Sequence, residues 1–256
     1  MQYSTFAAID IGSYDVILEI FEISKKQGIR SVDKICHRME LGKDTYTLGK
    51  IRPEMEEELC RVLADFVRIM EGYRVDAYRA MASSAISEAA NSLYVLGKIR
   101  QLTGLSVTVL SNSEQRFLGY KALAAMEDNF NKVIEKGTAI LDLDGGSFQI
   151  SLFDKDALVT TQNIRMGSLR VRERLAGIQS ETEHYEEMVE ELIWNEVSSF
   201  KKMYLKDRKI ENIMLIGDVF TDSVYKDIEA KTTKIISLEN LNTRYEKFIR
   251  RSLKAT

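Results

Sequence analysis

The chain has 256 residues, of which 45% are hydrophobic and 29% are charged, a globular composition long enough for two domains. The 36 Lys and Arg residues against 39 Asp and Glu residues give a formal net charge of −3, which excludes a general attraction to nucleic acid or to an anionic membrane. No apolar run approaches the ~20 residues of a membrane span, and the N-terminus lacks the pattern of a signal peptide. Because Cys36 and Cys60 show no metal-ligand spacing, we interpret both as free buried thiols in a reducing cytoplasm.

The first predicted element is a β-hairpin near the N-terminus. Apolar residues lead into Asp10, a turn follows at Gly12 and Ser13, and residues 16–23 form a returning strand. Weak alternation over residues 30–41 predicts a third strand beside them.

Helices and strands then follow one another to the middle of the chain. Residues 42–50 are polar and predict a loop. Pro53 precedes apolar residues at helical spacing, which predicts a helix over residues 56–70. Further strands are predicted over residues 73–82 and 106–110, and further helices over residues 84–91, 92–103 and 114–126. The polar stretch that follows predicts a single domain boundary. The two predicted domains would cover residues 1–127 and residues 128–256.

A second hairpin lies in residues 139–153. Its first strand leads into Asp142, and a glycine-rich tip at residues 144–147 separates it from an alternating strand. Two adjacent glycines let the backbone turn tightly and bring peptide N–H groups against a ligand, while a carboxylate at the strand end can bind a cation. The tip therefore suits a phosphate with a metal ion. An ordinary hairpin turn is the alternative, because short glycine motifs match by chance.

The C-terminal part is richer in basic residues. The patterns predict a strand over residues 157–164, an arginine-rich turn or short helix over 167–175, a long helix over 181–204, a strand over 213–216 and a basic helix over 238–253. The basic groups could bind a polyphosphate or a partner, or could simply be solvated. They are Arg165, Arg170, Arg172, Arg174 and the cations of the last helix.

The two hairpins repeat one unit, a strand, an Asp, a Gly/Ser turn and a returning strand, about half a chain apart. Such a duplication predicts two similar α/β domains, with both turns lining the cleft between them. Asp10 and Asp142 would face each other and share a divalent ion, and the amides of the two turns would bind a phosphate. Capping of their own turns is the alternative role for these aspartates.

The pairing of AAIDIGS with LDLDGGS resembles the two phosphate-binding loops of the sugar kinase, heat-shock protein and actin superfamily. With residues 82–91, 109–120 and 165–170, these motifs are similar in order and spacing to the exopolyphosphatase and guanosine pentaphosphate phosphatase (Ppx/GppA) family, over nearly the whole chain. The resemblance implies two ribonuclease H-like (actin-like ATPase) domains facing an interdomain cleft. It also implies hydrolysis of inorganic polyphosphate or guanosine pentaphosphate (pppGpp) with Mg²⁺ or Mn²⁺, and it allows a homodimer.

The resemblance assigns roles to individual residues. It places the catalytic positions at Glu114 and Gln115 and the metal ligands at Asp10 and Asp142. The phosphate-binding positions that it implies are Gly12, Ser13, Asp144, Gly145, Gly146 and Ser147.

Three positions depart from the family pattern. Gln115 stands at the catalytic glutamate, and an amide can orient a water molecule but cannot accept its proton. Ser87 replaces a phosphate-binding arginine, and Asp144 replaces the first glycine of the second loop. Glu114 is retained, but on a helix its side chain would point about a third of a turn away from that of its neighbour. We therefore predict that hydrolysis is much weakened or absent.

Two functions remain open from the sequence. The first is a metal-dependent phosphoanhydride hydrolase with slow turnover. The second is a sensor or regulatory protein that closes its domains around a phosphorylated ligand without hydrolysing it. A kinase of the same superfamily is a weaker third, because Gly217 and Asp218 match a glycine-rich adenosine loop poorly.

Overall fold

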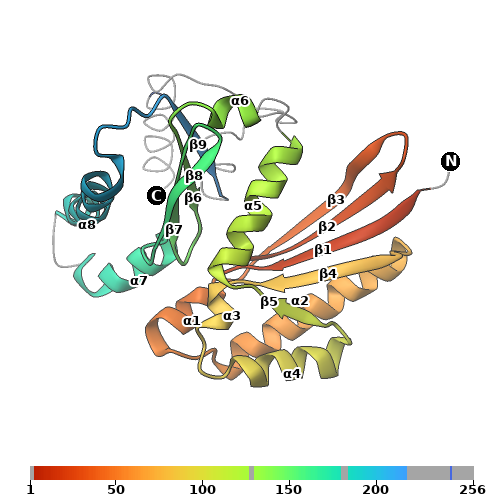
Figure 1. Ribbon diagram of the computed structural model, residues 1–256. Helices are drawn as coiled ribbons and strands as arrows, with labels where there is room; N and C mark the ends of the chain where they lie inside the picture. Colours follow the sequence, from red (N-terminus) through yellow and green to blue (C-terminus); the bar gives the residue numbers. More distant parts are fainter. Residues whose placement is uncertain (1–2, 127–129, 180–183, 218–242, 244–256) are drawn as a thin grey trace. The chain divides into compact units, whose positions relative to one another are not determined.

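The computed structural model describes residues 3–126, 130–179, 184–217 and 243. Within these ranges the chain is a mixed α/β protein with a five-stranded and a four-stranded sheet (Figure 1).

The chain divides into two compact units. The first comprises Met1–Arg116 and Ser168–Tyr185, and the second comprises Phe117–Gly167 and Glu186–Thr256. This division differs from the single passage predicted at residues 127/128, which itself falls outside the described residues. The chain passes from the first unit to the second, returns to the first for residues 168–185 and then passes to the second again. No shift in amino-acid composition predicted this return.

The first unit is built on a sheet of order β3-β2-β1-β4-β5. Its first three strands are antiparallel neighbours, whereas β4 and β5 run parallel to β1. The strands are β1 (Ser4–Ile11), β2 (Asp15–Ser24), β3 (Gly28–Arg38), β4 (Ala77–Ala82) and β5 (Val107–Val109). The helices are α1 (Leu41–Leu48), α2 (Pro53–Gly72), α3 (Ser84–Ser87), α4 (Ser92–Thr103) and α7 (Ser168–Gln179).

One face of this sheet is covered by α2 and α4 (Figure 1). Alternate β2 residues Val16, Leu18 and Ile20 are fully buried against them, as the two-residue period of a strand requires. The helix α2 begins at Pro53, where the missing N–H costs nothing, and presents one apolar face to the sheet.

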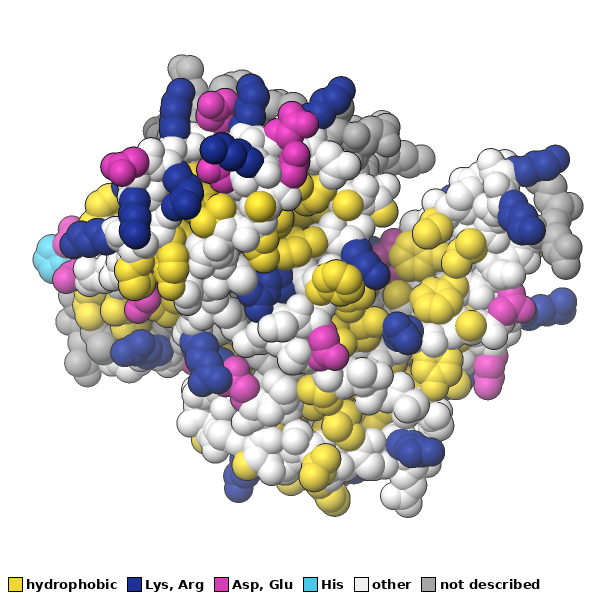
Figure 2. Space-filling view, in the orientation of Figure 1, with side chains coloured by type: hydrophobic (Ala, Val, Ile, Leu, Met, Phe, Trp, Pro, Cys, Tyr) yellow, Lys and Arg dark blue, Asp and Glu magenta, His cyan; other side chains and the backbone are white. Residues whose placement is uncertain are grey.

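The other face of the first sheet is less completely covered by described residues. Ile17 and Phe21, which alternate with the buried positions of β2, are only partly buried, and Tyr78 in β4 is 39% exposed. Figure 2 shows apolar side chains gathered over these strands.

The second unit is built on a sheet of order β8-β7-β6-β9, with β9 parallel to β6 and the other pairs antiparallel. Its strands are β6 (Thr138–Leu143), β7 (Phe148–Asp154), β8 (Ala157–Ile164) and β9 (Asn212–Ile216). The helical segments are α5 (Asn112–Met126), which spans the division between the units, α6 (Phe130–Ile134), α8 (Tyr185–Phe200) and a π-helix (Lys201–Leu205).

Two apolar clusters lie on this second sheet. Ile140 packs with Phe130 and residues of α5, whereas its neighbour Leu141 packs with Phe148 and Phe200. Successive side chains of β6 therefore enter different clusters, as expected for a strand buried on both faces.

The two sheets share a topology, because β8-β7-β6-β9 repeats the order and directions of β3-β2-β1-β4. Each begins with a hairpin whose first strand carries the predicted aspartate. The predicted α/β duplication is confirmed.

Two local predictions differ from the structure, and a third falls on residues that the structure does not describe. Residues 42–50 are not a loop, because α1 occupies Leu41–Leu48 and its polar residues are satisfied by tertiary contacts. Buried Asp44, for example, accepts hydrogen bonds from the backbone and side-chain nitrogens of Arg52. Cys36 is exposed, although Cys60 is buried as predicted. The helix predicted over residues 238–253 lies outside the described residues.

In the part of the chain that the structure describes, no helix has the length and apolar character that crossing a membrane requires.

Candidate functional site

The first turn joins β1 to β2. Asp10 lies one residue before the end of β1, opposite Ile17 of β2 and Met81 of β4, and its side chain is exposed. The Gly12 N–H donates to the Asp15 carbonyl over 2.9 Å and closes the turn. This amide therefore stabilises the turn itself, so an anion here would have to bind other amides.

The Ser13 side chain points into the first unit. It is 0% exposed, and its hydroxyl lies 2.6 Å from the Tyr46 hydroxyl and 3.3 Å from the Ser84 hydroxyl. Tyr46 and Ser84 are themselves 2.8 Å apart, so the three hydroxyls form one cluster. Sequence reasoning missed Tyr46, because it assigned this residue to a polar loop.

A tight approach of α1 supports this cluster. The Gly42 N–H donates to the Ser13 carbonyl over 2.8 Å. A Cβ atom at Gly42 would come within 2.6 Å of the Tyr46 ring and 3.0 Å of the Ser13 Cβ, so only glycine lets the helix approach the turn this closely.

The side chain of Arg170, from α7, covers Tyr46. Its guanidinium carbon lies 3.8 Å from the centroid of the Tyr46 ring, and Nη2 donates to both Glu88 oxygens over 3.0 Å. Cation–π stacking and a charge-assisted pair fix this arginine within the first unit. Ser87, where the family pattern has an arginine, is exposed at the end of α3.

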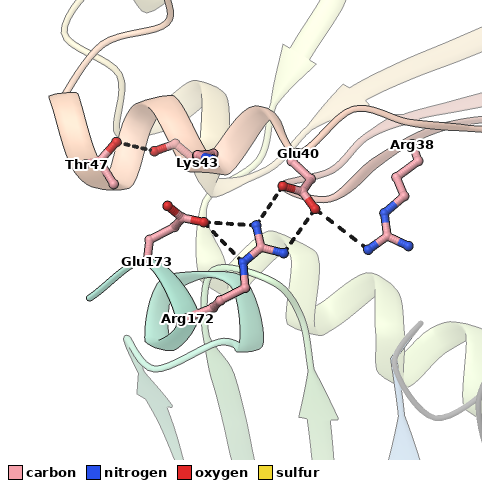
Figure 3. Close-up of polar contacts among 6 residues, drawn as sticks. All are labelled: Arg38, Glu40, Lys43, Thr47, Arg172 and Glu173. Carbon is pink, nitrogen blue, oxygen red and sulfur yellow. Dashed lines mark hydrogen bonds and ion pairs between the residues drawn. The ribbon is translucent and has the colours of Figure 1, made fainter. Parts of the chain in front are cut away.

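A second arginine of α7 makes a bidentate ion pair (Figure 3). Arg172 Nη1 and Nη2 lie 3.0 and 2.6 Å from the two Glu40 oxygens, and the same guanidinium contacts Glu173. Hydrogen bonding from Arg172 holds the pKa of the Glu40 carboxyl below its ordinary value, and the Glu40 carboxylate raises the pKa of Arg172. Two arginines that the sequence offered as polyanion ligands thus pair with carboxylates of their own unit.

The second turn joins β6 to β7. Asp142 lies one residue before the end of β6, opposite Gln149 and Ile216, and is half-buried. The Asp144 N–H donates to the Ser147 carbonyl over 3.0 Å, and the Gly145 N–H donates to the Asp144 Oδ1 carboxylate oxygen over 2.6 Å.

Backbone rather than side chains packs against the second turn. Gly145 and Gly146 are buried, and a Cβ at Gly167 would lie 2.3 Å from the Ser147 nitrogen and 2.4 Å from the Asp144 carbonyl oxygen. A Cβ at Gly217 would lie 2.0 Å from the Leu143 carbonyl oxygen. Glycine is required at both positions, because any side chain would displace the turn.

Glu114 and Gln115, the two positions that the resemblance predicts to be catalytic, lie in the first turn of α5. Ser111 and Glu114 form a capping box: the Glu114 carboxylate accepts the Ser111 N–H over 2.9 Å, and the Ser111 hydroxyl lies 3.3 Å from the Glu114 nitrogen. Hydrogen bonds from the Ser111 hydroxyl and amide hold the pKa of the Glu114 carboxyl below its ordinary value. Gln115 is half-buried, and its N–H donates to the Ser111 carbonyl over 3.0 Å.

The predicted site residues fall into two sets. Asp10, Gly12 and Ser13 lie in the first unit with both catalytic positions, and the predicted residues from Asp142 to Ser147 lie in the second. No group of three or more His, Cys, Asp or Glu side chains among the described residues is arranged to hold a metal ion.

Two known proteins with similar sequences match 93% and 56% of this chain. A bifunctional 3-dehydroquinate synthase/phosphatase of Fusobacterium nucleatum is 22% identical over 255 residues, 93% of this chain and 37% of that protein. Exopolyphosphatase 1 of Mycobacterium leprae is 25% identical over 144 residues, 56% of this chain and 41% of that protein. The chain spans less than half the length of these curated relatives.

A solved exopolyphosphatase structure from Cytophaga hutchinsonii has a TM-score of 0.73 at 18% identity, and the match covers 99% of this chain and 80% of that chain. This similarity confirms the predicted fold, two ribonuclease H-like domains of the actin-like ATPase type. The two duplicated hairpins form the first strands of the two sheets of this fold, and the other motifs lie between and after them in the sequence. Residues 19–255 match the model of the Ppx/GppA phosphatase family, and the chain belongs to this family.

Proposed function

We propose that the chain binds a phosphoanhydride, inorganic polyphosphate or pppGpp, through the two hairpin turns, and that it hydrolyses this ligand slowly. The duplicated strand–Asp–turn unit supports binding, because each unit presents a carboxylate beside a tight turn closed by a backbone hydrogen bond.

A divalent ion fits the donor set. Asp10 and Asp142 supply carboxylate oxygens, the hard ligands that Mg²⁺ and Mn²⁺ prefer. Mg²⁺ keeps several water ligands and needs only one or two carboxylates, so a cluster of three acidic groups is not required. The bound ion would neutralise phosphate charge, and the two aspartates are the residues that would hold it.

The capping role of Glu114 is the observation that supports slow turnover. Its carboxylate is bound to Ser111, and a carboxyl with a lowered pKa is a weaker general base. Gln115 can orient water but cannot take its proton. The acid neighbouring Gln115 is therefore poorly suited to replace the missing base.

The test compares phosphate release from tripolyphosphate and pppGpp, with Mg²⁺ or Mn²⁺, by the native chain and by Gln115→Glu. We expect little release from the native chain and an increase on the order of 10²–10⁴ in the variant, the usual contribution of a positioned general base. Gln101→Glu, an exposed position on α4, is the matched control and should change nothing. Efficient release by the native chain would contradict slow turnover.

The second candidate is a non-catalytic sensor or regulatory protein for the same ligands. Loss of the base with retention of both aspartates favours it, because binding can persist without chemistry. Calorimetry distinguishes the two functions. Binding of tripolyphosphate that is lost in Asp10→Asn and in Asp142→Asn, with no release from the native chain, supports the sensor.

A further inference from the structure

The second turn contains its own anion. The Gly145 N–H, a donor that the proposed function assigns to phosphate, already donates to the carboxylate of Asp144 over 2.6 Å. Asp144 is half-buried, so solvent screens its charge only in part.

The backbone of this turn has little freedom to present a different set of amides. Gly167 lies against Asp144 and Ser147 so closely that a single added carbon would overlap their backbone atoms. The Asp144 N–H is also used, because it donates to the Ser147 carbonyl over 3.0 Å. An anion that binds the Gly145 amide would therefore have to displace the carboxylate.

A carboxylate and a phosphate oxygen require the same donor and carry the same sign of charge. The carboxylate has the advantage of attachment to the adjacent residue, so its effective concentration at the Gly145 amide is high. A phosphate must overcome both the occupied hydrogen bond and the repulsion between two anions.

We propose that Asp144 is a specificity-determining residue that competes with phosphate for the Gly145 amide and so weakens the binding of metal-free phosphoanhydrides at the second turn. This inference rests on the proposed function, since it concerns the affinity of the same site.

The test is calorimetric titration of the full chain with tripolyphosphate in the presence of a chelator. Asp144→Gly removes the carboxylate and frees the amide, so we expect binding about tenfold tighter than native, the effect of roughly one hydrogen bond and one like charge. Asp144→Asn keeps an acceptor but not the charge, and its affinity should lie between the two. Asp156→Asn, at an exposed aspartate in the turn between β7 and β8, makes the same charge change as Asp144→Asn and should leave affinity unchanged.

Equal affinity of the native chain and Asp144→Gly would overturn the inference while leaving the proposed function standing. Failure of every variant to bind tripolyphosphate, both with the chelator and again with Mg²⁺ in its place, would overturn the proposed function instead. In that case amide hydrogen exchange decides the inference without a ligand. Faster exchange of the Gly145 amide in Asp144→Gly supports occupation by the carboxylate, and unchanged exchange overturns it.

Discussion

The two hairpin turns have the same strand order around them but are stabilised in opposite ways. Side chains brace the first turn: the Ser13 hydroxyl is bound to Tyr46, and Arg170 stacks on that ring. Backbone braces the second, where Gly167 and Gly217 leave no room for a Cβ.

This difference shows that two copies of a duplicated unit can share a strand topology while different contacts stabilise their turns. Apart from the close approach at Gly42, the first turn depends on polar contacts between segments far apart in sequence, so substitutions of these polar side chains should weaken it gradually. The second depends on the absence of side chains, so one added methyl group should disrupt it at once.

The largest effect is expected at the second turn. Gly167→Ala would place a carbon 2.3 Å from the Ser147 nitrogen and 2.5 Å from the Gly145 carbonyl carbon. Because backbone cannot move aside cheaply, we expect the free energy of unfolding to fall by about 3 kcal/mol, the upper range for overpacking. Urea denaturation measures this change.

Gly177→Ala is the matched control for that substitution. Gly177 lies in α7, and a Cβ there meets no atom within 4 Å. Alanine should therefore be neutral or stabilise the helix by up to about 1 kcal/mol. Equal behaviour of the two alanine variants would refute the tight packing of the second turn.

A moderate effect is expected at the first turn. Tyr46→Phe keeps the ring under Arg170 but removes the central hydroxyl of a part-buried cluster, which should cost about 1–2 kcal/mol. Hydrogen exchange should increase at the Gly42 amide, which donates to Ser13.

Tyr73→Phe is the control, because it tests whether loss of any tyrosine hydroxyl changes hydrogen exchange at Gly42. In the native chain the Tyr73 hydroxyl donates to Asp33 over 2.9 Å at an exposed site. We expect no change in exchange at Gly42. An unchanged Gly42 amide in Tyr46→Phe as well would show that the hydroxyl cluster does not support the turn.

The smallest effect is expected at the Arg172 and Glu40 pair, which fastens α7 to the first unit. Both side chains are partly exposed, at 38% and 28%, so a double-mutant cycle with Arg172→Met and Glu40→Gln should give a coupling of no more than about 1 kcal/mol. Arg174→Met, at an exposed position of the same helix, should not couple to Glu40→Gln.

The pH dependence of this coupling follows from the lowered pKa of Glu40. A carboxyl with a lower pKa in the folded state stabilises it fully above the unfolded pKa of about 4.5, and the stabilisation is lost as pH falls through the lower folded value. The coupling should be constant near pH 7 and vanish under strongly acidic conditions. A coupling that grows on acidification would be incompatible with this ion pair.

The sequence by itself determined the duplicated hairpins and the family. Both follow from local patterns, since alternation marks the strands, and an aspartate before a Gly/Ser turn recurs in the two halves. It also placed Asp10 and Asp142 correctly at corresponding positions of β1 and β6, because register along one strand is a local property.

Only the tertiary structure decided what each turn contacts. The α1 helix escaped prediction because its polar residues are satisfied by partners elsewhere in the chain, such as Arg52 for Asp44 and Ala85 for Thr45. The return of α7 to the first unit combines burial of Leu169, Val171 and Leu175 with ion pairs over long sequence separations. Such contacts have no periodicity along the chain, so their physical cause, complementary packing and charge, exists only once the chain has folded.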